Sequence, residues 1–349
     1  MNFGSRFRNR FYSISIGFNF ILILIVFIGA GYYTKLKTSQ GETWRSDTAA
    51  ANFQKQLQLK QWDYFEINDT FVNENCQLEY KILEYLDMSK KTPQICAATE
   101  AEDGAPSRNL HKEGIWEKRF QTVFFGEVLP MFPEAVFIDI GTQLGTYTIP
   151  VAALGKTTYS FEPVRRTVEF LRHSIALNNF NDRIHLYNYA LMDSIYCVQI
   201  TRPVSNPYLG RSIMTKTDDC NQKLDGVNVA VLDNLLPILK KDNVKQAILK
   251  IDIEGSEAKA ILGGLKLFRE IDIAVIQMEF HVIQSKMRDG TKEEGEIVMK
   301  FIEQMKEMGY KASPVVRQNK NSKWYAAKNV LSYDKLFKRP TDVLWHRLS

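Results

Sequence analysis

The sequence predicts an α/β fold with a mainly parallel sheet and helices on both faces. Beyond Ala135, short apolar runs alternate with segments whose apolar residues recur at helical spacing. Strands separated by helices need crossover connections, and these make neighbouring strands parallel. The runs are almost continuously apolar, as strands buried on both faces are. Acids stand at or near the ends of several runs, where ligands of such sheets bind.

The predicted elements follow one another in a regular order. The strands are AVFIDI, TTYSFEP, RIHLYNYAL, QAILKIDIEG, IAVIQMEF, YKASPVV and DVLWHRL. The segments between them are helical by their apolar spacing, and Pro150 lies near enough to the first turn of the first helix, 147–154, to be tolerated. Gly309 ends the last helix. Residues 195–233 hold several prolines and glycines and predict hairpins or loops.

The N-terminal part of the 349 residues predicts attachment to a membrane. Residues 11–34 carry no charge and contain about the 20 mostly apolar residues that a spanning helix needs. They predict a transmembrane signal anchor that follows a cytosolic leader, 1–10. Residues 35–110 predict a stem and N-terminal extension, and 111–349 the main domain. A cleaved signal peptide stays open as an alternative, because residues 29–31 are small.

The charges beside the apolar stretch predict its orientation. Arg6, Arg8 and Arg10 precede it and favour a cytosolic N-terminus. The body would then lie in the lumen of the Golgi or endoplasmic reticulum, as a single-pass type II protein. The sequon at Asn68 agrees with a lumenal body. Basic residues also follow the stretch, so a cytosolic body that acts on a small molecule or a lipid stays open.

Four cysteines, an even number, predict disulfides in a lumenal body. The local pairing joins Cys76 to Cys96 and Cys197 to Cys220, and it is one of three possible pairings. Four free buried thiols are the alternative. No C-x-x-C occurs and the five histidines are scattered, so we expect no metal site. The net charge of +5 is modest and follows no block pattern, which argues against nucleic-acid binding.

A glycine-rich turn follows the first strand. Gly141 and Gly145 allow a tight turn and close approach to a ligand, although a purely structural turn is the alternative. The acid Asp139 would repel a pyrophosphate but suits a cationic amine; it could equally cap the amides of the loop. Glu162 ends the second strand, where a carboxylate can accept both ribose hydroxyls. A cofactor with an amine, a ribose and no phosphate is S-adenosylmethionine.

The order of the motifs resembles that of the FkbM-type methyltransferases, which are Rossmann-like S-adenosylmethionine enzymes. The resemblance rests on FIDIGTQLGTYTIPVA, SFEPV, IHLYNYALMD, VAVLDNLL, LKIDIEGSEAKAILGG, VIQMEF and DVLWHRL, from about Val136 to the C-terminus. It implies seven strands in the order 3-2-1-4-5-7-6, with strand 7 antiparallel. It also implies methyl transfer, most often to a hydroxyl oxygen. Gln143 departs from the asparagine usual in the glycine loop of the family.

Further cofactor contacts are expected after the third strand. Asn188, Ala190 and Leu191 lie where the adenine should be, although neutral packing is the alternative. The expected cofactor site thus consists of Asp139, Gly141, Gln143, Gly145, Glu162, Asn188, Ala190 and Leu191.

A second group of acids predicts the chemistry. Asp252 and Glu254 alternate to one side of their strand, together with Lys250, and Glu279 ends the next strand. Two close carboxylates raise one another's pKa, which can make a general base for removing a hydroxyl proton. A purely structural role is the alternative for Asp252 and Glu254.

These observations predict a membrane-anchored methyltransferase that acts on the oxygen of a hydroxyl acceptor, such as a glycan or a small molecule. A non-catalytic membrane protein that keeps the fold as a binding or trafficking module is the alternative. The sequence carries no readable code for the acceptor.

Overall fold

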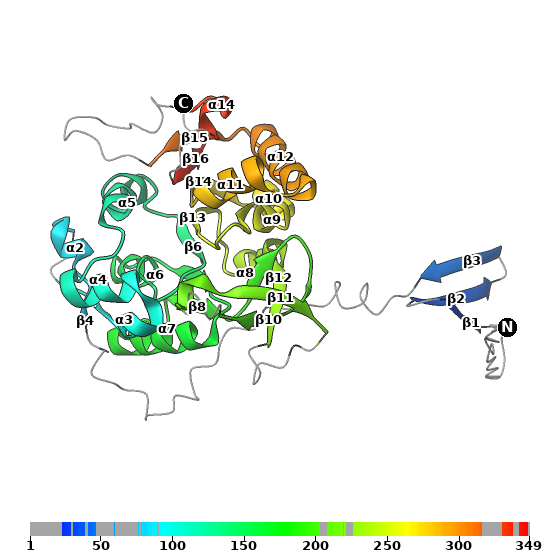
Figure 1. Cartoon of the computed structure of the whole chain (residues 1–349), viewed down its shortest axis with the longest axis horizontal. Helices are drawn as coiled ribbons and strands as arrows, with labels where there is room; N and C mark the ends of the chain where they lie inside the picture. The colour runs from blue at the N-terminus through cyan, green and yellow to red at the C-terminus, as the bar shows by residue number, and fades with distance from the viewer. Residues whose placement is uncertain are drawn as a thin grey trace, which may run out of the picture. The chain divides into compact units, whose positions relative to one another are not determined.

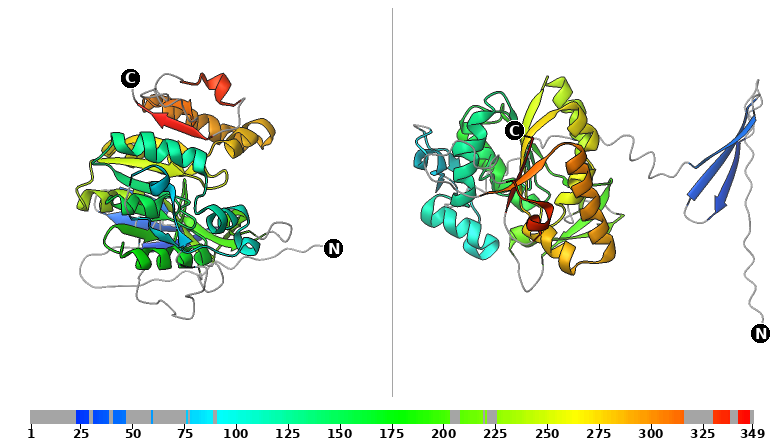
Figure 2. Two further views of the ribbon diagram at one scale, coloured as in Figure 1. Left: turned by 90° about the vertical axis from the view of Figure 1, so that its left-hand side faces the viewer. Right: turned by 90° about the horizontal axis from the view of Figure 1, so that it is seen from above.

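The chain divides into two compact units, Met1–Gln58 and Leu59–Ser349. The computed structural model describes residues 23–28, 31–38, 41–46, 59, 76, 78–88, 91–202, 208–218, 220, 226–315, 330–337 and 342–347. The second unit contains all the expected strands and helices of the main domain (Figures 1 and 2).

A seven-stranded sheet forms the centre of the second unit. Its strands are β6 (Val136–Ile140), β7 (Thr158–Phe161), β8 (Ile184–Tyr187), β13 (Gln246–Ile251), β14 (Asp272–Met278), β15 (Lys311–Pro314) and β16 (Val343–His346). Their order in space is β8-β7-β6-β13-β14-β16-β15. Counted along the chain, this is 3-2-1-4-5-7-6. Only β16 runs antiparallel to its neighbours β14 and β15; the other pairs are parallel.

Helices cover the sheet in two groups. They are α6 (Thr148–Ala153), α7 (Arg165–Asn178), α8 (Leu236–Lys241), α9 (Glu257–Leu262), α10 (Leu265–Glu270), α11 (His281–Asp289), α12 (Lys292–Glu307) and α14 (Tyr333–Leu336). In Figure 1, α6 and α7 lie near the N-terminal extension, and α9 to α12 flank β13 and β14. The helix expected over 256–268 is interrupted between α9 and α10. A side chain at Gly263 would collide there with the backbone of Met192, so the chain approaches closely.

The N-terminal extension belongs to the same body as the sheet. It contains β4 (Leu78–Glu79), α2 (Ile82–Tyr85), β5 (Gln94–Ile95), α3 (Glu100–Asp103), α4 (Ala105–Glu113), α5 (Lys118–Val123), a π-helical turn (Phe124–Val128) and a 3-10 turn (Leu129–Met131). Buried residues such as Tyr80 and Phe124 share one apolar core with Phe137 of β6. The expected boundary at residue 110 is therefore not a structural boundary, because this core extends across it.

A smaller sheet extends from the main one. Its order is β11 (Ile213–Thr217), β10 (Tyr196–Thr201), β12 (Gly226–Val231), β9 (Ala190–Met192). The expected third strand is divided between the sheets, with β8 in the large one and β9 in the small one. Short 3-10 turns occupy Leu209–Arg211 and Leu232–Leu235.

Two disulfides tie the outer segments of the body. Cys76 is joined to Cys96 in the extension, and Cys197 to Cys220 in the hairpin region of the small sheet. These are the two local pairs expected from the sequence. Free thiols are absent from the described residues.

The described residues of the stretch 11–34, which are 23–28 and 31–34, form strands where a transmembrane helix was expected. Residues 23–46 contain an antiparallel meander of β1 (Ile23–Ile28), β2 (Gly31–Thr38) and β3 (Gly41–Ser46). The β-branched and aromatic composition of ILIVFI favours strand pairing. Within the described residues, no helix is both apolar and long enough to cross a membrane. The leader and the sequon at Asn68 lie outside the described residues.

Candidate active site

One large cavity opens at the carboxyl edge of the central sheet. Its volume is about 460 Å³, within the range of small-molecule sites. Residues at or just beyond the ends of β6, β7, β13 and β14 line it, together with the extension and the small sheet. Eight of the expected site residues line the cavity: Gly141, Gln143, Glu162, Ala190, Leu191, Asp252, Glu254 and Glu279. Asp139, Gly145 and Asn188 do not line it.

The glycine loop after β6 requires its two glycines. Gly141 has φ +80° and Gly145 has φ +84°, a region that only glycine enters easily. A Cβ on Gly141 would collide with the backbone oxygen of Asp252, and one on Gly145 would collide with Leu171. The loop therefore packs directly on neighbouring backbone and side chains, and its residues Gly141 and Gln143 form part of the cavity wall.

Gln143 contacts both the second strand and the N-terminal extension. Its backbone N–H donates to Glu162 Oε2 at 2.9 Å, and its side-chain Nε2 donates to Asp103 Oδ1 at 2.9 Å. Asp103 also accepts from the backbone and the hydroxyl of Ser107. Burial raises the pKa of Asp103 to about 6. The longer glutamine side chain thus reaches a partner that the sequence did not suggest.

Glu162 is a buried carboxyl that faces the cavity from the end of β7. Besides Gln143, the backbone N–H of Val164 donates to its Oε1 at 2.9 Å. Burial raises the pKa of Glu162 to about 7, against the lowering effect of these two hydrogen bonds. Hydroxyl donors from a ligand would stabilise its charged form further.

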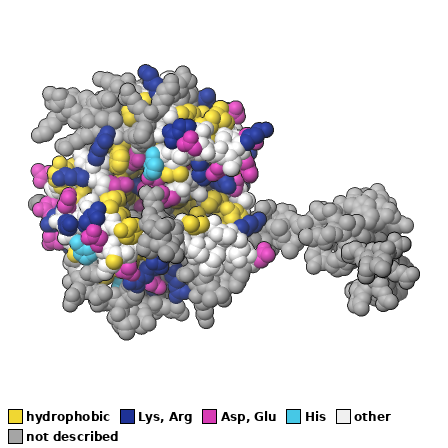
Figure 3. All heavy atoms as spheres, viewed as in Figure 1, with side chains coloured by type: hydrophobic (Ala, Val, Ile, Leu, Met, Phe, Trp, Pro, Cys, Tyr) yellow, Lys and Arg dark blue, Asp and Glu magenta, His cyan; other side chains and the backbone are white. Residues whose placement is uncertain are grey.

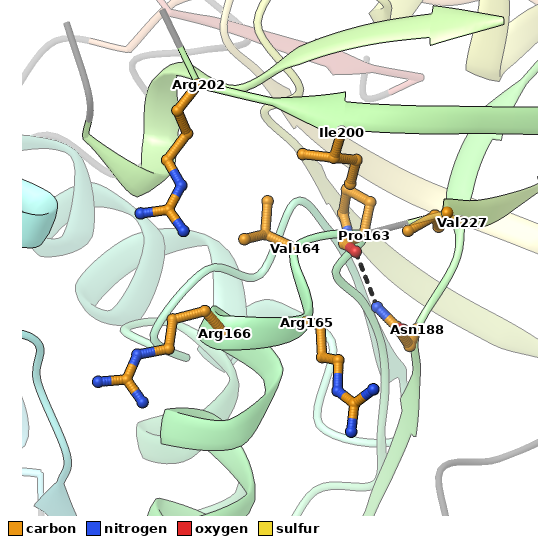
Figure 4. Close-up of a pocket in the computed structure, with 9 residues that line it drawn as sticks. Pro163, Val164, Arg165, Arg166, Asn188, Ile200, Arg202 and Val227 are labelled. Atoms are coloured by element: carbon orange, nitrogen blue, oxygen red, sulfur yellow. Dashed lines mark hydrogen bonds between the residues drawn. The ribbon is translucent and has the colours of Figure 1, made fainter. Parts of the chain in front are cut away.

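Asn188 supports Glu162 rather than lining the cavity. Its Nδ2 donates to the backbone oxygen of Glu162 at 2.8 Å. It also donates to the backbone oxygen of Pro163 at 2.9 Å (Figure 4). Asn188 was expected to contact the adenine. Instead, its amide nitrogen binds the turn after β7. Ala190 and Leu191 line the cavity, as expected.

A second, much smaller cavity of about 30 Å³ lies beside Pro163 and Asn188. Arg165, Arg166 and Arg202 surround it (Figure 4). Arg165 pairs with Glu169, and Arg166 with Glu102 and Glu169. The Arg166–Glu102 pair joins α7 to the extension, whereas the two pairs with Glu169 lie within α7. Over the visible surface, basic and acidic side chains are interspersed, without a basic face (Figure 3).

Asp139 lies beneath the glycine loop, not in the cavity. Thr148 Oγ1 donates to its Oδ2 at 2.7 Å, and its buried Oδ1 has no hydrogen-bond partner among the described residues. Burial raises its pKa. Asp139 was expected to contact the amine of a cofactor directly. It does not line the cavity, so it can affect a bound cofactor only through the glycine loop.

Asp252 is held as a carboxylate by Lys250. The Lys250 ammonium donates to Asp252 Oδ2 at 2.9 Å, and its side chain is almost fully buried. Burial alone would raise the pKa of Asp252, but Lys250 outweighs it and holds the pKa below the ordinary value. The expectation that neighbouring carboxylates raise this pKa is therefore wrong for Asp252, because the ion pair with Lys250, two residues earlier, has the larger effect.

Glu254 reaches the cavity from a turn rather than from a strand. β13 ends at Ile251, and Glu254 has φ +53°. Glu257 fixes this turn, since its Oε1 accepts from the backbone N–H groups of Ile253 and Gly255. The two-residue alternation that predicted one face for Asp252 and Glu254 does not apply here, although both still line the cavity.

Glu279, at the end of β14, is held in its protonated form. Burial raises its pKa to about 10, and the nearby Asp252 and Glu254 carboxylates add to the increase. Its Oε1 lies 3.1 Å from Nδ1 of His281. A carboxyl that keeps its proton at neutral pH can donate a hydrogen bond but cannot serve as a base.

Glu117 is a cavity residue that the sequence did not reveal. It precedes α5 with φ +47°, and Tyr147 Oη donates to its Oε2 at 3.1 Å. Gln277 Nε2 donates in turn to Tyr147 Oη at 3.1 Å. Burial raises the pKa of Glu117 to about 7, while Lys250 lowers it. No motif marks this residue, which lies before the first strand of the sheet.

Comparison with protein families finds one family model that matches most of the central sheet and its helices. Residues 139–312 match the model of the methyltransferase FkbM domain. This segment is an FkbM methyltransferase domain. Its cofactor is S-adenosylmethionine. No curated protein matches the chain.

The solved structures that the chain matches include two bacterial proteins named as O-methyltransferases. One, from Bacillus cereus in complex with SAH, is 12% identical, covers 79% of this chain and 92% of its own, and has a TM-score of 0.37. The other, from Klebsiella pneumoniae, is 14% identical, covers 68% of this chain and 86% of its own, and has a TM-score of 0.36.

The cavity of the FkbM domain suits a cationic cofactor of this size. Among the described residues that line it, six are acids and none is basic: Asp103, Glu117, Glu162, Asp252, Glu254 and Glu279. The apolar residues Ile140, Phe161 and Leu191 also line the cavity. Glu162 would hold the ribose hydroxyls, and the acids complement the positive charges of the amine and the sulfonium.

Proposed function

We propose that this protein transfers a methyl group to the hydroxyl oxygen of a glycan or small-molecule acceptor. The observation that carries the proposal is the large cavity in which the glycine loop, Glu162 and the acids after β13 and β14 meet. An acid-lined cavity does not favour an anionic acceptor, because its charge would be repelled there. Neutral hydroxyl compounds fit this environment.

The cofactor supplies an electrophilic methyl group when bound. The chain's own residues then have three tasks. Glu162 orients the ribose end, and the walls from the extension and the small sheet exclude water. A base must remove the hydroxyl proton, and Glu279 in its protonated form can hold the acceptor by donating a hydrogen bond. Asp252 and Glu254 remain the expected residues around the reacting group.

We predict that Glu162→Gln weakens binding of S-adenosylmethionine tenfold to about a hundredfold. The change removes charge-assisted hydrogen bonds worth roughly 1.5–3 kcal/mol, and about 1.4 kcal/mol corresponds to a factor of ten. Its amide oxygen can still accept from a loop N–H, so the fold should persist. Calorimetric titration of the body with S-adenosylmethionine and with its demethylated product measures the effect.

Asp182→Asn is the matched control, because this carboxylate is 74% exposed and lies outside the cavity. It should bind as the parent does. Equal affinities for Glu162→Gln and the parent would refute the role of Glu162. Labelled cofactor with a panel of glycan and small-molecule alcohols tests transfer itself. Cofactor binding without transfer to any of them, or no binding at all, would favour the non-catalytic binding module instead.

The same proposal places the body in the lumen of the secretory pathway, attached to the membrane through the uncharged stretch 11–34. Two disulfides in the described residues support it, since such bonds persist in oxidising compartments. Within a bilayer the same stretch would have to be helical, because lipid offers no partners to the backbone.

We predict that the protein made in eukaryotic cells loses mass on glycosidase treatment, and that Asn68→Gln abolishes this loss. The reason is that only a lumenal sequon meets the glycosylation machinery. Gel mobility with and without glycosidase measures it, and Thr70→Ser, which keeps the sequon, is the control. A protein without glycan whose C-terminus is digested in sealed microsomes would place the body in the cytosol.

A further inference from the structure

The start of α5 is held against the FkbM domain by specific contacts. Gln121 Nε2 donates to the backbone oxygen of Thr146 at 3.2 Å, and Tyr80 Oη donates to Gln121 Oε1 at 2.7 Å. Gln121 and Tyr80 are fully buried. These contacts place Glu117, the residue just before α5, next to Tyr147 and at the cavity wall.

Backbone strain is concentrated at this cavity. In the part of the chain that the structure describes, six residues other than glycine have a positive φ: Asp87, Glu117, Gln143, Asn179, Asn243 and Glu254. Three of them, Glu117, Gln143 and Glu254, line the cavity. Such conformations cost of order 1–3 kcal/mol each and persist where the surroundings impose them, often at active sites. The conformation of Glu117 is therefore imposed by the packing of α5.

We propose that Glu117, supplied by the N-terminal extension, is the general base that removes the proton of the acceptor hydroxyl. The inference rests on the proposed function. As the bond between the acceptor oxygen and the methyl carbon forms, the hydroxyl proton passes to the Glu117 carboxylate. The electron pair of the broken carbon–sulfur bond stays on sulfur, so atoms and charges balance.

The geometry favours Glu117 over Asp252 and Glu279, two of the other acids that line the cavity. Asp252 is paired with Lys250 at 2.9 Å, and Glu279 is protonated at neutral pH. Among the described residues, Glu117 accepts one hydrogen bond, from Tyr147 to Oε2, and its Oε1 accepts none. One carboxylate oxygen is thus oriented by Tyr147, and the other is available to a hydroxyl in the cavity.

The charge of Glu117 depends on groups from all the elements packed around it. They are Lys250 and Asp252 at β13, Asp139 on β6, Tyr147 before α6, Tyr80 after β4 and Asp342 before β16. Lys250 favours the carboxylate, whereas the acids and burial favour the protonated form. The balance puts the titration of Glu117 near pH 7.

The test is Glu117→Gln in the full-length protein, with Glu113→Gln on the exposed end of α4 as the matched control. We expect Glu117→Gln to bind S-adenosylmethionine within about threefold of the parent and to lose turnover by 10²–10⁴-fold. The parent rate should rise with pH through about 7, and this rise should be absent from the variant. Infrared spectra recorded over the same pH range, without cofactor or acceptor, should show one carboxyl titration fewer in Glu117→Gln than in the parent. Glu113→Gln should show the same titration near pH 7 as the parent.

Full turnover, or an unchanged rise with pH in Glu117→Gln, would overturn the inference while leaving the proposed function intact. A parent that neither binds cofactor nor transfers methyl would overturn both. If Glu117→Gln does not fold, Tyr147→Phe serves instead. Loss of the donor to Oε2 should move the rise to higher pH by about one unit, and an unmoved profile would contradict the assignment.

Discussion

Gly141→Ala is expected to lower the free energy of unfolding of the body by more than about 3 kcal/mol. At φ +80° a residue with a Cβ costs roughly 1–2 kcal/mol by itself. The added Cβ would also collide with the backbone oxygen of Asp252. That oxygen cannot withdraw easily, because the N–H of Asp252 donates to Ile140 at 3.0 Å and β13 is paired with β6. Chemical denaturation measures the loss.

Gly155→Ala separates the two causes. Gly155 has a similar backbone, with φ +88°, but nothing lies within 4 Å of an added Cβ. It should cost only the conformational part, roughly 1–2 kcal/mol. Equal losses in the two variants would mean that the contact with Asp252 is unimportant. Only Gly141→Ala should also abolish cofactor binding, since it displaces the turn that carries Asp252 and Glu254.

The sequence predicted much of the cavity because strand ends follow a general rule. Gly141, Glu162, Asp252 and Glu279 each stand at or just beyond an apolar strand, and parallel strands bring such ends to one edge. The lysine–aspartate pair was within reach of the same reasoning, since Lys250 and Asp252 are two residues apart. Its effect on pKa required the distance between the two side chains.

Other residues could not be placed from sequence. Glu117 meets Tyr147 only because Gln121 and Tyr80 fasten α5 to the glycine loop, and no local pattern encodes this long-range contact. Asn188 was assigned to adenine because it follows a strand, but its amide was needed by the turn after β7. For the apolar segment at the N-terminus, hydropathy measures apolar content, and strands and spanning helices can share it.

Lys250→Met is expected to lower the free energy of unfolding by about 3–5 kcal/mol at pH 8. Methionine keeps an apolar side chain of similar length up to Cε but leaves the Asp252 carboxylate buried without its cation. Lys250 also lies over the ring of Tyr147, 4.8 Å from its centroid. Lys292→Met is the control, because Lys292 is 91% exposed and should change the free energy by no more than about 0.5 kcal/mol.

The loss from Lys250→Met should depend on pH in a defined direction. In the parent, neighbouring acids raise the pKa of Lys250 despite its burial, so its contribution is fully present below the unfolded value of 10.5. In the variant, burial acts on Asp252 without Lys250 to oppose it, so the folded pKa of Asp252 rises. An acid whose pKa is higher in the folded than in the unfolded state stabilises the fold at low pH, and this stability is lost as pH rises through the folded pKa. The deficit should therefore be largest at pH 8 and shrink towards pH 5.

The double variant Lys250→Met with Asp252→Asn tests the origin of this deficit. Removing both charges leaves no unpaired carboxylate, so most of the lost free energy should return and its dependence on pH should flatten. A double variant that is as unstable as Lys250→Met would show that the methylene packing or the contact with Tyr147 matters more than the charge. The ion pair would then be a consequence of the packing around β13, and the low pKa of Asp252 would not explain the stability of the site.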